Sequence, residues 1–428
     1  MANLVKRIPL LSSAMPEPPF KGLVDGAADA VPANFVRLLG AQFANKLADT
    51  LASAKVVLPW IMNSVGAPVF LTGLLVPIRE SGSLLPQIVM GGYVRQYAIR
   101  KWLTVVGALA QALAVLLIAL AAYSLDGVTA GLTIIALLAV LSLSRGLCSL
   151  TSKDVLGKAI PKNNRGKLMG LGATLSGLVG IAVGFSVYFD WPNAGNGFFG
   201  LLAGAACCWG LTALMYARVA EFEGQEEAAQ NAREQIAKSL KLLRSDQPFR
   251  RFVMVRTLMM SSGLSAPYFI LLAQQSTAGA SFENLGLFII TSGIASFVSS
   301  QIWGNAADRS SRRVLIITSI LTAMLCALGA LASYIGSQDL WLMVALFFAL
   351  NITHQGVRLG RKTYIVDMAD GNKRTDYIAT SNSAIGVLLL ATGVFGALAA
   401  QFSMTLVLLL FTLMSLGASL LGRTLPEA

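Results

Sequence analysis

The stretch Gly304-Asn305-Ala306-Ala307-Asp308-Arg309-Ser310-Ser311-Arg312-Arg313 carries the most information about the fold of this chain. It lies between two long apolar runs, residues 286–303 and 314–335. A glycine, an Asp-Arg pair and a double arginine in this order are typical of a tight basic turn between two membrane helices. A degraded copy, residues 92–101, begins 212 positions earlier (304 − 92) and also lies between apolar runs. Two copies at half-chain spacing predict a membrane protein built from a duplicated half.

The composition independently places the chain in a membrane. Hydrophobic residues make up 55% of the 428 residues, charged residues make up 13%, and the mean hydropathy is +0.67. A spanning helix needs about 20 mostly apolar residues. Twelve segments meet this requirement, at about 34–61, 67–90, 102–124, 127–150, 168–190, 197–219, 251–275, 283–303, 314–336, 340–361, 377–399 and 402–422. We therefore predict an all-α integral membrane protein with twelve transmembrane helices, because helices satisfy their own backbone groups in lipid.

The placement of charge predicts the topology. The net charge is +12, and its basic residues fill every second loop between the predicted spans. They are Arg95, Arg100, Lys101, Lys153, Lys158, Lys162, Arg165, Lys167, Arg309, Arg312, Arg313, Arg358, Arg361, Lys362, Lys373 and Arg374. The intervening loops carry only the acids Asp126, Asp190, Glu283 and Asp339. This positive-inside pattern predicts a cell inner membrane protein with both termini in the cytoplasm, and it argues against a nucleic-acid partner.

The chain divides into two halves. Prolines at 9, 16, 18 and 19 interrupt the short apolar patch of residues 1–33, so we expect this segment to be a cytoplasmic tail. Residues 425–428 are expected to form a second short tail. We expect six-helix bundles at 34–220 and 251–424. The charged segment 221–250 interrupts the apolar rhythm, and its apolar residues recur at helical spacing. This segment predicts a cytoplasmic linker that contains an amphipathic helix.

The two decapeptides resemble the loop between the second and third helices of each half in major facilitator superfamily transporters. The resemblance implies two six-helix bundles in pseudo-two-fold arrangement and a gating role for the loop residues. These residues are Gly92, Arg100, Lys101, Gly304, Asp308, Arg309, Arg312 and Arg313. Ser311 replaces the usual second glycine, and Gln96 stands where the family carries an aspartate. In the family this acid helps to lock the cytoplasmic gate through charge contacts with neighbouring helices. Asp308 of the second loop is therefore expected to provide more of these contacts. A purely topological role for both loops is the alternative.

The first predicted helix is the most polar span. Gln42, Lys46, Asp49 and Ser53 fall within an arc of about 60°, with Asn45 beside it. A charge at the centre of a bilayer costs about 2.5–3.5 kcal/mol on insertion scales, so this arc must face a watery cavity or partner charges. Lys46 and Asp49 are close enough in sequence to pair. Arg37 and Lys55 are expected on the opposite side, near the helix ends, where long side chains can reach the interface.

The second helix places Arg79 and Glu80 near its midpoint. We expect a buried network of Lys46, Asp49, Arg79 and Glu80. In the functional interpretation Asp49 or Glu80 carries a coupling proton while the cations hold an anionic substrate group. In the structural interpretation the four residues form a static ion-pair cluster. Arg145 in the fourth helix resembles the arginine of a family element associated with proton coupling, and a structural partnership with Glu80 or Asp49 is the alternative.

The second half contributes fewer charges. Arg256 lies in the inner third of the seventh helix, and the small residues and proline at 261–267 are expected to soften the middle of that helix. A polar belt in the tenth helix contains Asn351, His354 and Gln355, and Asn382 lies in the eleventh. His354 is the only histidine. A neutral, hydrogen-bonded packing histidine is favoured over a proton relay.

These features predict a secondary active transporter rather than an enzyme. The sequence has no nucleotide-binding lysine loop, metal cluster or nucleophile elbow, so we expect no cofactor and no metal. A monomer would rock 34–220 against 251–424 and carry a small polar or anionic solute with protons or another coupling ion. An excess of cations over acids favours an anion. The alternatives are a drug or amphiphile exporter, which the missing proline after Gly184 makes less favoured, and a non-transporting receptor.

Overall fold

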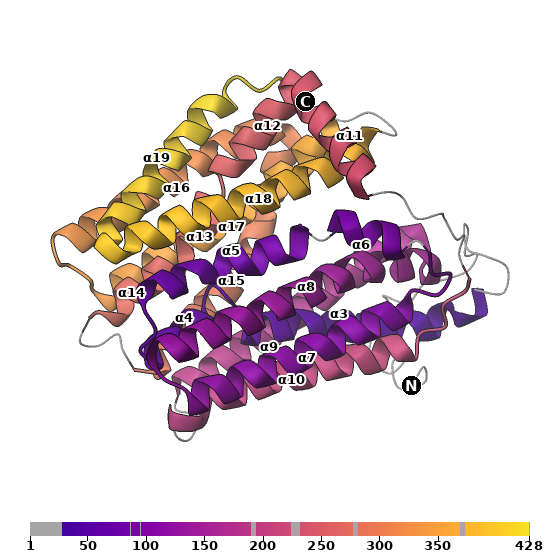
Figure 1. Cartoon of the computed structure of the whole chain (residues 1–428), viewed down its shortest axis with the longest axis horizontal. Helices are drawn as coiled ribbons and strands as arrows, with labels where there is room; N and C mark the ends of the chain where they lie inside the picture. The colour runs from indigo at the N-terminus through magenta and orange to yellow at the C-terminus, as the bar shows by residue number, and fades with distance from the viewer. Residues whose placement is uncertain are drawn as a thin grey trace.

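The computed structural model describes residues 28–85, 87–94, 96–189, 194–223, 232–276, 281–368 and 373–427. Residues 1–27 of the predicted tail, 224–231 of the predicted linker and Ala428 lie outside this part of the chain. The first half contains η1 (Ala28–Ala30), α3 (Val31–Leu51), α4 (Val57–Ser64), α5 (Val69–Leu84), α6 (Gln87–Val94), α7 (Lys101–Ser124), α8 (Gly127–Ala159), α9 (Lys162–Tyr188) and α10 (Ala194–Ala217). The second half contains α11 (Ala232–Ser245), α12 (Gln247–Leu258), α13 (Ser261–Leu264), α14 (Ala266–Gln274), α15 (Glu283–Arg309), α16 (Ser311–Tyr334), α17 (Leu340–Met368), α18 (Lys373–Phe402) and α19 (Met404–Gly422). The predicted all-α fold of two bundles is confirmed, and Figure 1 shows one bundle lying beside the other.

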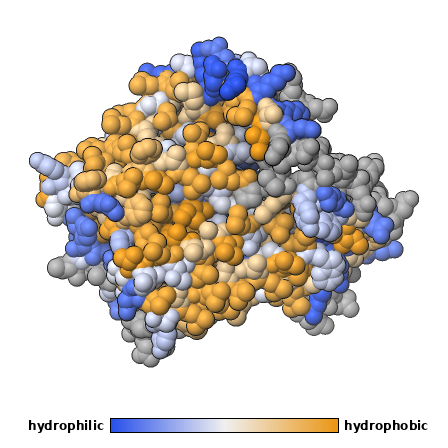
Figure 2. Space-filling model, viewed as in Figure 1, coloured by the Kyte–Doolittle hydropathy of each residue, from blue (hydrophilic) through white to orange (hydrophobic). Residues whose placement is uncertain are grey.

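The helices carry the apolar surface that a bilayer requires. Eight helices in the described residues are long and apolar enough to cross a membrane by themselves. Large hydrophobic side chains point outward from them, such as Leu113 on α7, Leu328 on α16 and Phe395 on α18. Figure 2 shows hydrophobic residues over most of one face and hydrophilic residues gathered toward its rim. This distribution is the reverse of a water-soluble surface and fits a belt in contact with lipid.

The first span is broken into α3 and α4, although the sequence predicted one helix over 34–61. Pro59 lies in the first turn of α4. It has no N–H to bond the carbonyl of Lys55, and its ring would clash with that carbonyl in a continuous helix. The chain therefore turns at residues 52–56, where the Lys55 N–H donates to Ser53 Oγ at 3.3 Å. This turn places Lys55 inside the molecule.

Two other spans are interrupted at prolines. The second span consists of α5 and α6, with Pro86 between them in the sequence. The seventh consists of α12, α13 and α14, with Pro267 at the start of α14. The predicted softening of this helix over 261–267 is confirmed. Prolines remove backbone hydrogen bonds in a helix, and residues next to the breaks of the first and seventh spans, such as Lys55 and Met260, line the cavity described below.

The two bundles contact each other along two helix pairs, α5 with α18 and α9 with α15. Glycines permit the close approach. A Cβ atom on Gly286 of α15 would lie 2.5 Å from the carbonyl oxygen of Gly184 and 2.6 Å from the nitrogen of Tyr188, both on α9. A Cβ atom on Gly393 of α18 would lie 2.0 Å from Cγ of Pro77 on α5. Any larger residue would force these helices apart.

Helix α11 lies in the segment that the sequence predicted as an amphipathic linker. It contacts α12 and α18 of the second bundle and α6 of the first. Thr380 of α18 donates to Ser239 Oγ of α11 at 3.0 Å. Ile236 and Leu240 are exposed. The linker helix therefore touches both bundles at one end of the molecule.

Candidate functional site

A cavity of about 270 Å³ lies between the bundles and is lined by both. The first bundle contributes Asp49, Ser53, Ala54, Lys55, Val76, Arg79, Glu80, Leu84 and Arg145, and the second contributes Arg256, Met260, Gly263, Leu264, His354, Arg358, Arg361, Ile385 and Leu389. This lining contains six lysines and arginines but only two carboxylates. With His354 neutral, the lining carries four more positive than negative charges. A cavity with low-dielectric walls and one sign of charge concentrates ions of the opposite sign.

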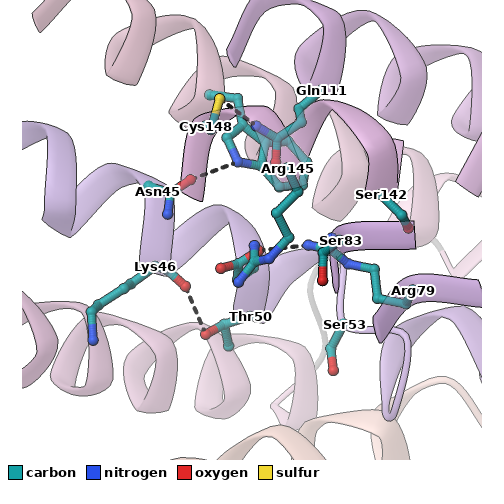
Figure 3. Close-up of polar contacts among 12 residues, drawn as sticks. Asn45, Lys46, Thr50, Ser53, Arg79, Ser83, Gln111, Ser142, Arg145 and Cys148 are labelled. Carbon is teal, nitrogen blue, oxygen red and sulfur yellow. Dashed lines mark hydrogen bonds and ion pairs between the residues drawn. The ribbon is translucent and has the colours of Figure 1, made fainter. Parts of the chain in front are cut away.

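Asp49 is the centre of the charged network on the first bundle. Arg79 Nη2 donates to Asp49 Oδ1 at 2.9 Å, and Arg145 Nη1 donates to the same oxygen. The two arginines come from different helices, α5 and α8, and Figure 3 shows their side chains extending toward each other. The grouping of Asp49 with Arg79 agrees with the predicted network, and Arg145 is a partner of Asp49. One carboxylate therefore stabilises two cations within the membrane-spanning region.

Lys46 does not pair with Asp49, contrary to the expectation from their spacing. The structure gives the Lys46 side chain no ion pair with a described residue, and Lys46 is absent from the cavity lining. Figure 3 shows its ammonium directed away from Arg79 and Arg145. The two arginines occupy the carboxylate because their planar forks reach it from neighbouring helices, whereas Lys46 lies one turn back on the same helix.

Glu80 differs from Asp49 in its surroundings. It is exposed in the cavity, and its carboxylate has no ion pair or hydrogen bond with any side chain that the structure describes. Its nearest charges include Lys55 and Arg358, which lies on the opposite bundle. Glu80 is therefore held by the field of the cavity cations and not by a fixed partner. A carboxylate in this position can change its protonation without breaking a contact.

Lys55 joins the two bundles, and the prediction that its side chain reaches the membrane interface from the end of the first helix is wrong. Its Nζ lies 2.9 Å from Nε2 of His354, and Nδ1 of His354 lies 2.9 Å from Ser262 Oγ. An ammonium only donates hydrogen bonds, so Nε2 accepts and Nδ1 carries the proton. Ser262 in turn donates to the carbonyl of Met259 at 2.9 Å. This chain of donors assigns His354 as neutral, as the sequence favoured, and it makes the histidine a link between α17 and the first bundle.

Arg256 is buried without a carboxylate partner. Its residue is 8% exposed, Nη1 donates to Ser381 Oγ, and Nη2 donates to Asn382 Oδ1 at 3.0 Å. Its Nε has no hydrogen-bond partner, and neither does Nη1 of Arg79 on the opposite bundle. Arg256 and Asn382, which the sequence named on separate helices, are thus in contact. Buried arginine donors are normally satisfied, so each of these two lining residues keeps a donor atom that no described group satisfies.

Arg358 and Arg361 also line the cavity, although the sequence placed them in a cytoplasmic basic loop. Helix α17 continues to Met368, beyond the predicted end near residue 361, and carries both to the cavity. A signal for this position was present in the sequence. His354, Arg358 and Arg361 follow at intervals of four and three residues, so they occupy one face of a helix.

Five of the predicted asparagines and glutamines lie outside the cavity lining, and one of them, Asn382, binds the lining residue Arg256. The other four make contacts elsewhere. Trp209 Nε1 donates to Asn45 Oδ1 at 3.1 Å, and Asn351 Nδ2 donates to the carbonyl of Phe347 at 2.9 Å. Gln355 Nε2 donates to Ser296 Oγ at 3.2 Å. Gln42 lies against Gly172 of α9, whose Cβ would be 3.0 Å from Gln42 Cβ. The contacts of Gln42, Asn45 and Gln355 join neighbouring helices, whereas that of Asn351 lies within α17. The structure does not bring these four residues to the charged site.

The first predicted gating loop is organised by Glu221, which the sequence did not single out for this role. Its fully buried carboxylate accepts from the backbone N–H groups of Arg100 and Lys101, at 2.9 and 2.6 Å, and from Lys158 Nζ at 2.9 Å. Arg100 also pairs with Asp154 at 2.9 Å. Glu221 thus places a negative charge at the N-terminus of α7, where the helix dipole favours it. Glu221 and Asp154 therefore supply the negative charge near this loop that the neutral Gln96 does not.

The second predicted gating loop contacts the end of the chain. Arg312 Nη2 donates to the carbonyl of Arg423 at 2.8 Å, and Arg312 lies 3.8 Å from Glu427. The N–H of Arg313 donates to Ser310 Oγ, which caps α16. Arg309 is exposed at the end of α15. The backbones of Gly92 and Gly304 lie in α6 and α15, whereas the side chain of Asp308 lies outside the described part of the structure.

Comparison with known proteins identifies the family. A family model described as Major Facilitator Superfamily matches residues 38–299 and 252–427, so the chain belongs to this family and is a multi-pass membrane protein with the fold of a secondary transporter. No curated protein matches the sequence.

Solved structures of this fold resemble the whole chain. A D-xylose-proton symporter has a TM-score of 0.69 at 16% identity, over 92% of this chain and 98% of the other. The nucleoside transporter NupG has a TM-score of 0.69 at 10% identity, over 92% and 98%. A POT family transporter in complex with a thioalcohol conjugated peptide has a TM-score of 0.70 at 10% identity, over 96% and 97%. Identities this low establish the shared fold alone.

Proposed function

We propose that this protein moves a small anionic solute across a cell inner membrane by alternating access, together with protons. The observation that carries the proposal is the charge of the cavity, in which six cations face two carboxylates. Since Asp49 already binds two arginines, most of the remaining cations have no fixed counter-charge. Cations enclosed by apolar walls are costly unless an anion accompanies them. An anionic substrate would supply that charge.

Glu80 is the candidate carrier of the coupling proton. It is the only carboxylate of the cavity lining without an ion pair to a described residue, and it faces Lys55 and Arg358. These cations favour its ionised form while the cavity holds no other anion. An arriving anion would take over the same cations, and Glu80 would then bind a proton more readily. Anion binding and proton uptake would be coupled through shared cations, with no direct contact required.

The drug-exporter alternative requires a mostly apolar cavity, and the charged lining does not favour it. The positive-inside pattern supports cytoplasmic termini, because the basic residues around Arg100, Lys158 and Arg312 lie at the helix ends nearest the chain termini. The direction of net transport follows from the gradients that the cell maintains and not from the cavity.

Proton flux in proteoliposomes tests the proposal. The purified protein is reconstituted with an internal pH-sensitive dye, and succinate, lactate or glycerol 3-phosphate is added outside, with xylose as a neutral control. We expect an anion to drive proton movement in the wild type. Glu80→Gln should exchange labelled anion across the membrane but should not couple this exchange to a proton gradient. Proton movement driven by xylose alone would contradict the anionic substrate, and full proton coupling in Glu80→Gln would contradict the role of Glu80.

A further inference from the structure

The two walls of the cavity differ in charge. The wall from the first bundle combines Lys55, Arg79 and Arg145 with the acids Asp49 and Glu80, so its excess is one positive charge. The wall from the second bundle combines Arg256, Arg358 and Arg361 with no carboxylate, so its excess is three. The sequence suggested that the first bundle binds the anion, yet both acids of the lining are on that bundle.

The three arginines of the second wall form one cluster. Arg361 lies close enough to both Arg256 and Arg358 for their charges to repel one another. Arg256 is more than nine-tenths buried and binds only neutral oxygens, and its Nε has no hydrogen-bond partner. Neither Arg358 nor Arg361 has an ion pair or hydrogen bond with any side chain that the structure describes. A counter-ion bound at this wall would relieve their mutual repulsion.

From this arrangement we infer that the second-bundle wall is the primary anion site and that it selects a doubly charged oxyanion, such as a phosphate monoester, over a monocarboxylate. This inference rests on the proposed anionic substrate and specifies its class. A single negative charge would leave two of the three guanidinium charges uncompensated. A phosphoryl group carries nearly two charges at neutral pH and offers three acceptor oxygens, which match the donor forks of several arginines.

The opposite wall explains why the cluster remains selective. Glu80 lies within reach of the charges of Arg358 and Arg361, so it supplies one negative charge while the cavity holds no substrate. A weak monoanion would compete poorly with this carboxylate. A dianion would compensate the charges of Arg358 and Arg361 in place of Glu80, and Glu80 could then bind a proton. The apolar part of the substrate would then face Val76, Leu264 and Ile385.

Binding to the purified protein tests the inference with a matched series of probes, namely glycerol 3-phosphate, glycerate and glycerol. We expect glycerol 3-phosphate to bind at least about tenfold more tightly than glycerate at pH 7.5, as measured by calorimetry. The affinity for glycerol 3-phosphate should fall at pH 5.5, where its phosphate loses about half a charge or more, while glycerate should change less. Equal affinity for glycerate and glycerol 3-phosphate would overturn the inference and would leave the anionic substrate intact. Equal affinity for glycerol would overturn both.

Variants test whether the arginines of the second-bundle wall bind the anion. Arg361→Gln should lower the affinity for glycerol 3-phosphate by about tenfold and reduce its advantage over glycerate. Lys362→Gln is the matched control, because this adjacent cation on the same helix is absent from the cavity lining. Arg358→Gln, at an exposed position, serves as a second variant if Arg361→Gln folds poorly. Unchanged binding in both arginine variants, or no binding of glycerol 3-phosphate to the wild type at millimolar concentration, would refute the site.

Discussion

The substitution Asp49→Asn tests whether one carboxylate holds the charged network together. It keeps the shape of the side chain and removes the charge that Arg79 and Arg145 share. The side chains of Asp49, Arg79 and Arg145 are 22%, 11% and 33% exposed, so solvent screens them only in part. A hydrogen bond to a charged partner contributes about 1.5–3 kcal/mol. With two such bonds and a discount for partial exposure, we expect a loss of about 2–4 kcal/mol in the free energy of unfolding.

The assay is denaturant unfolding of the purified protein in mixed micelles, with Asp126→Asn as the control. Asp126 is exposed in a loop and its carboxylate has no capping contact with α8, so the same chemical change there should cost less than about 0.5 kcal/mol. The double variant Asp49→Asn/Arg79→Gln should lose less stability than the sum of the single variants, because both remove the same contact. A loss at Asp49 no larger than at Asp126, or strict additivity in the double variant, would refute the reasoning.

Two further substitutions test the supports of the site. Glu221→Gln should destabilise the protein by about 3 kcal/mol in the same unfolding assay, because Lys158 would lose a fully buried counter-charge, and an unchanged midpoint would contradict this role. Gly286→Ala should lower the thermal midpoint and raise the accessibility of Tyr188→Cys to a maleimide, because the new Cβ would lie 2.5 Å from a backbone oxygen of α9. Gly200→Ala, which meets nothing within 4 Å, is the control and should change neither measurement.

The sequence predicted the fold because lipid imposes strong constraints on it. Apolar runs of spanning length and the loop at Gly304–Arg313 were sufficient for the class of fold. Hydropathy did not predict where the first span is broken into two helices. Lys55 was expected to reach the membrane interface because a continuous first helix was assumed, whereas Pro59 accompanies a turn that carries Lys55 to the cavity.

The site was predicted in part for a related reason. Asp49, Glu80 and Arg79 were recognised because charges within apolar runs are costly, and Arg145 was recognised with them. Arg358 and Arg361 were assigned to a loop because basic residues near a span end normally set topology. Only the tertiary course of α17 shows that they face the cavity. The ion-pair partners of Asp49 could not be predicted from the sequence either. Spacing along the first helix favoured Lys46, whereas two arginines reach Asp49 from other helices.

The most direct test of the account is the labelling of a cavity residue from each side of the membrane. Ser53 lines the cavity, so Ser53→Cys in a chain with its four native cysteines replaced should be reached through either entrance. We predict that a membrane-impermeant maleimide modifies this cysteine from both faces of proteoliposomes, and that glycerol 3-phosphate slows the reaction. Modification from neither face, or from one face only, would contradict a central, alternately opened cavity between the bundles.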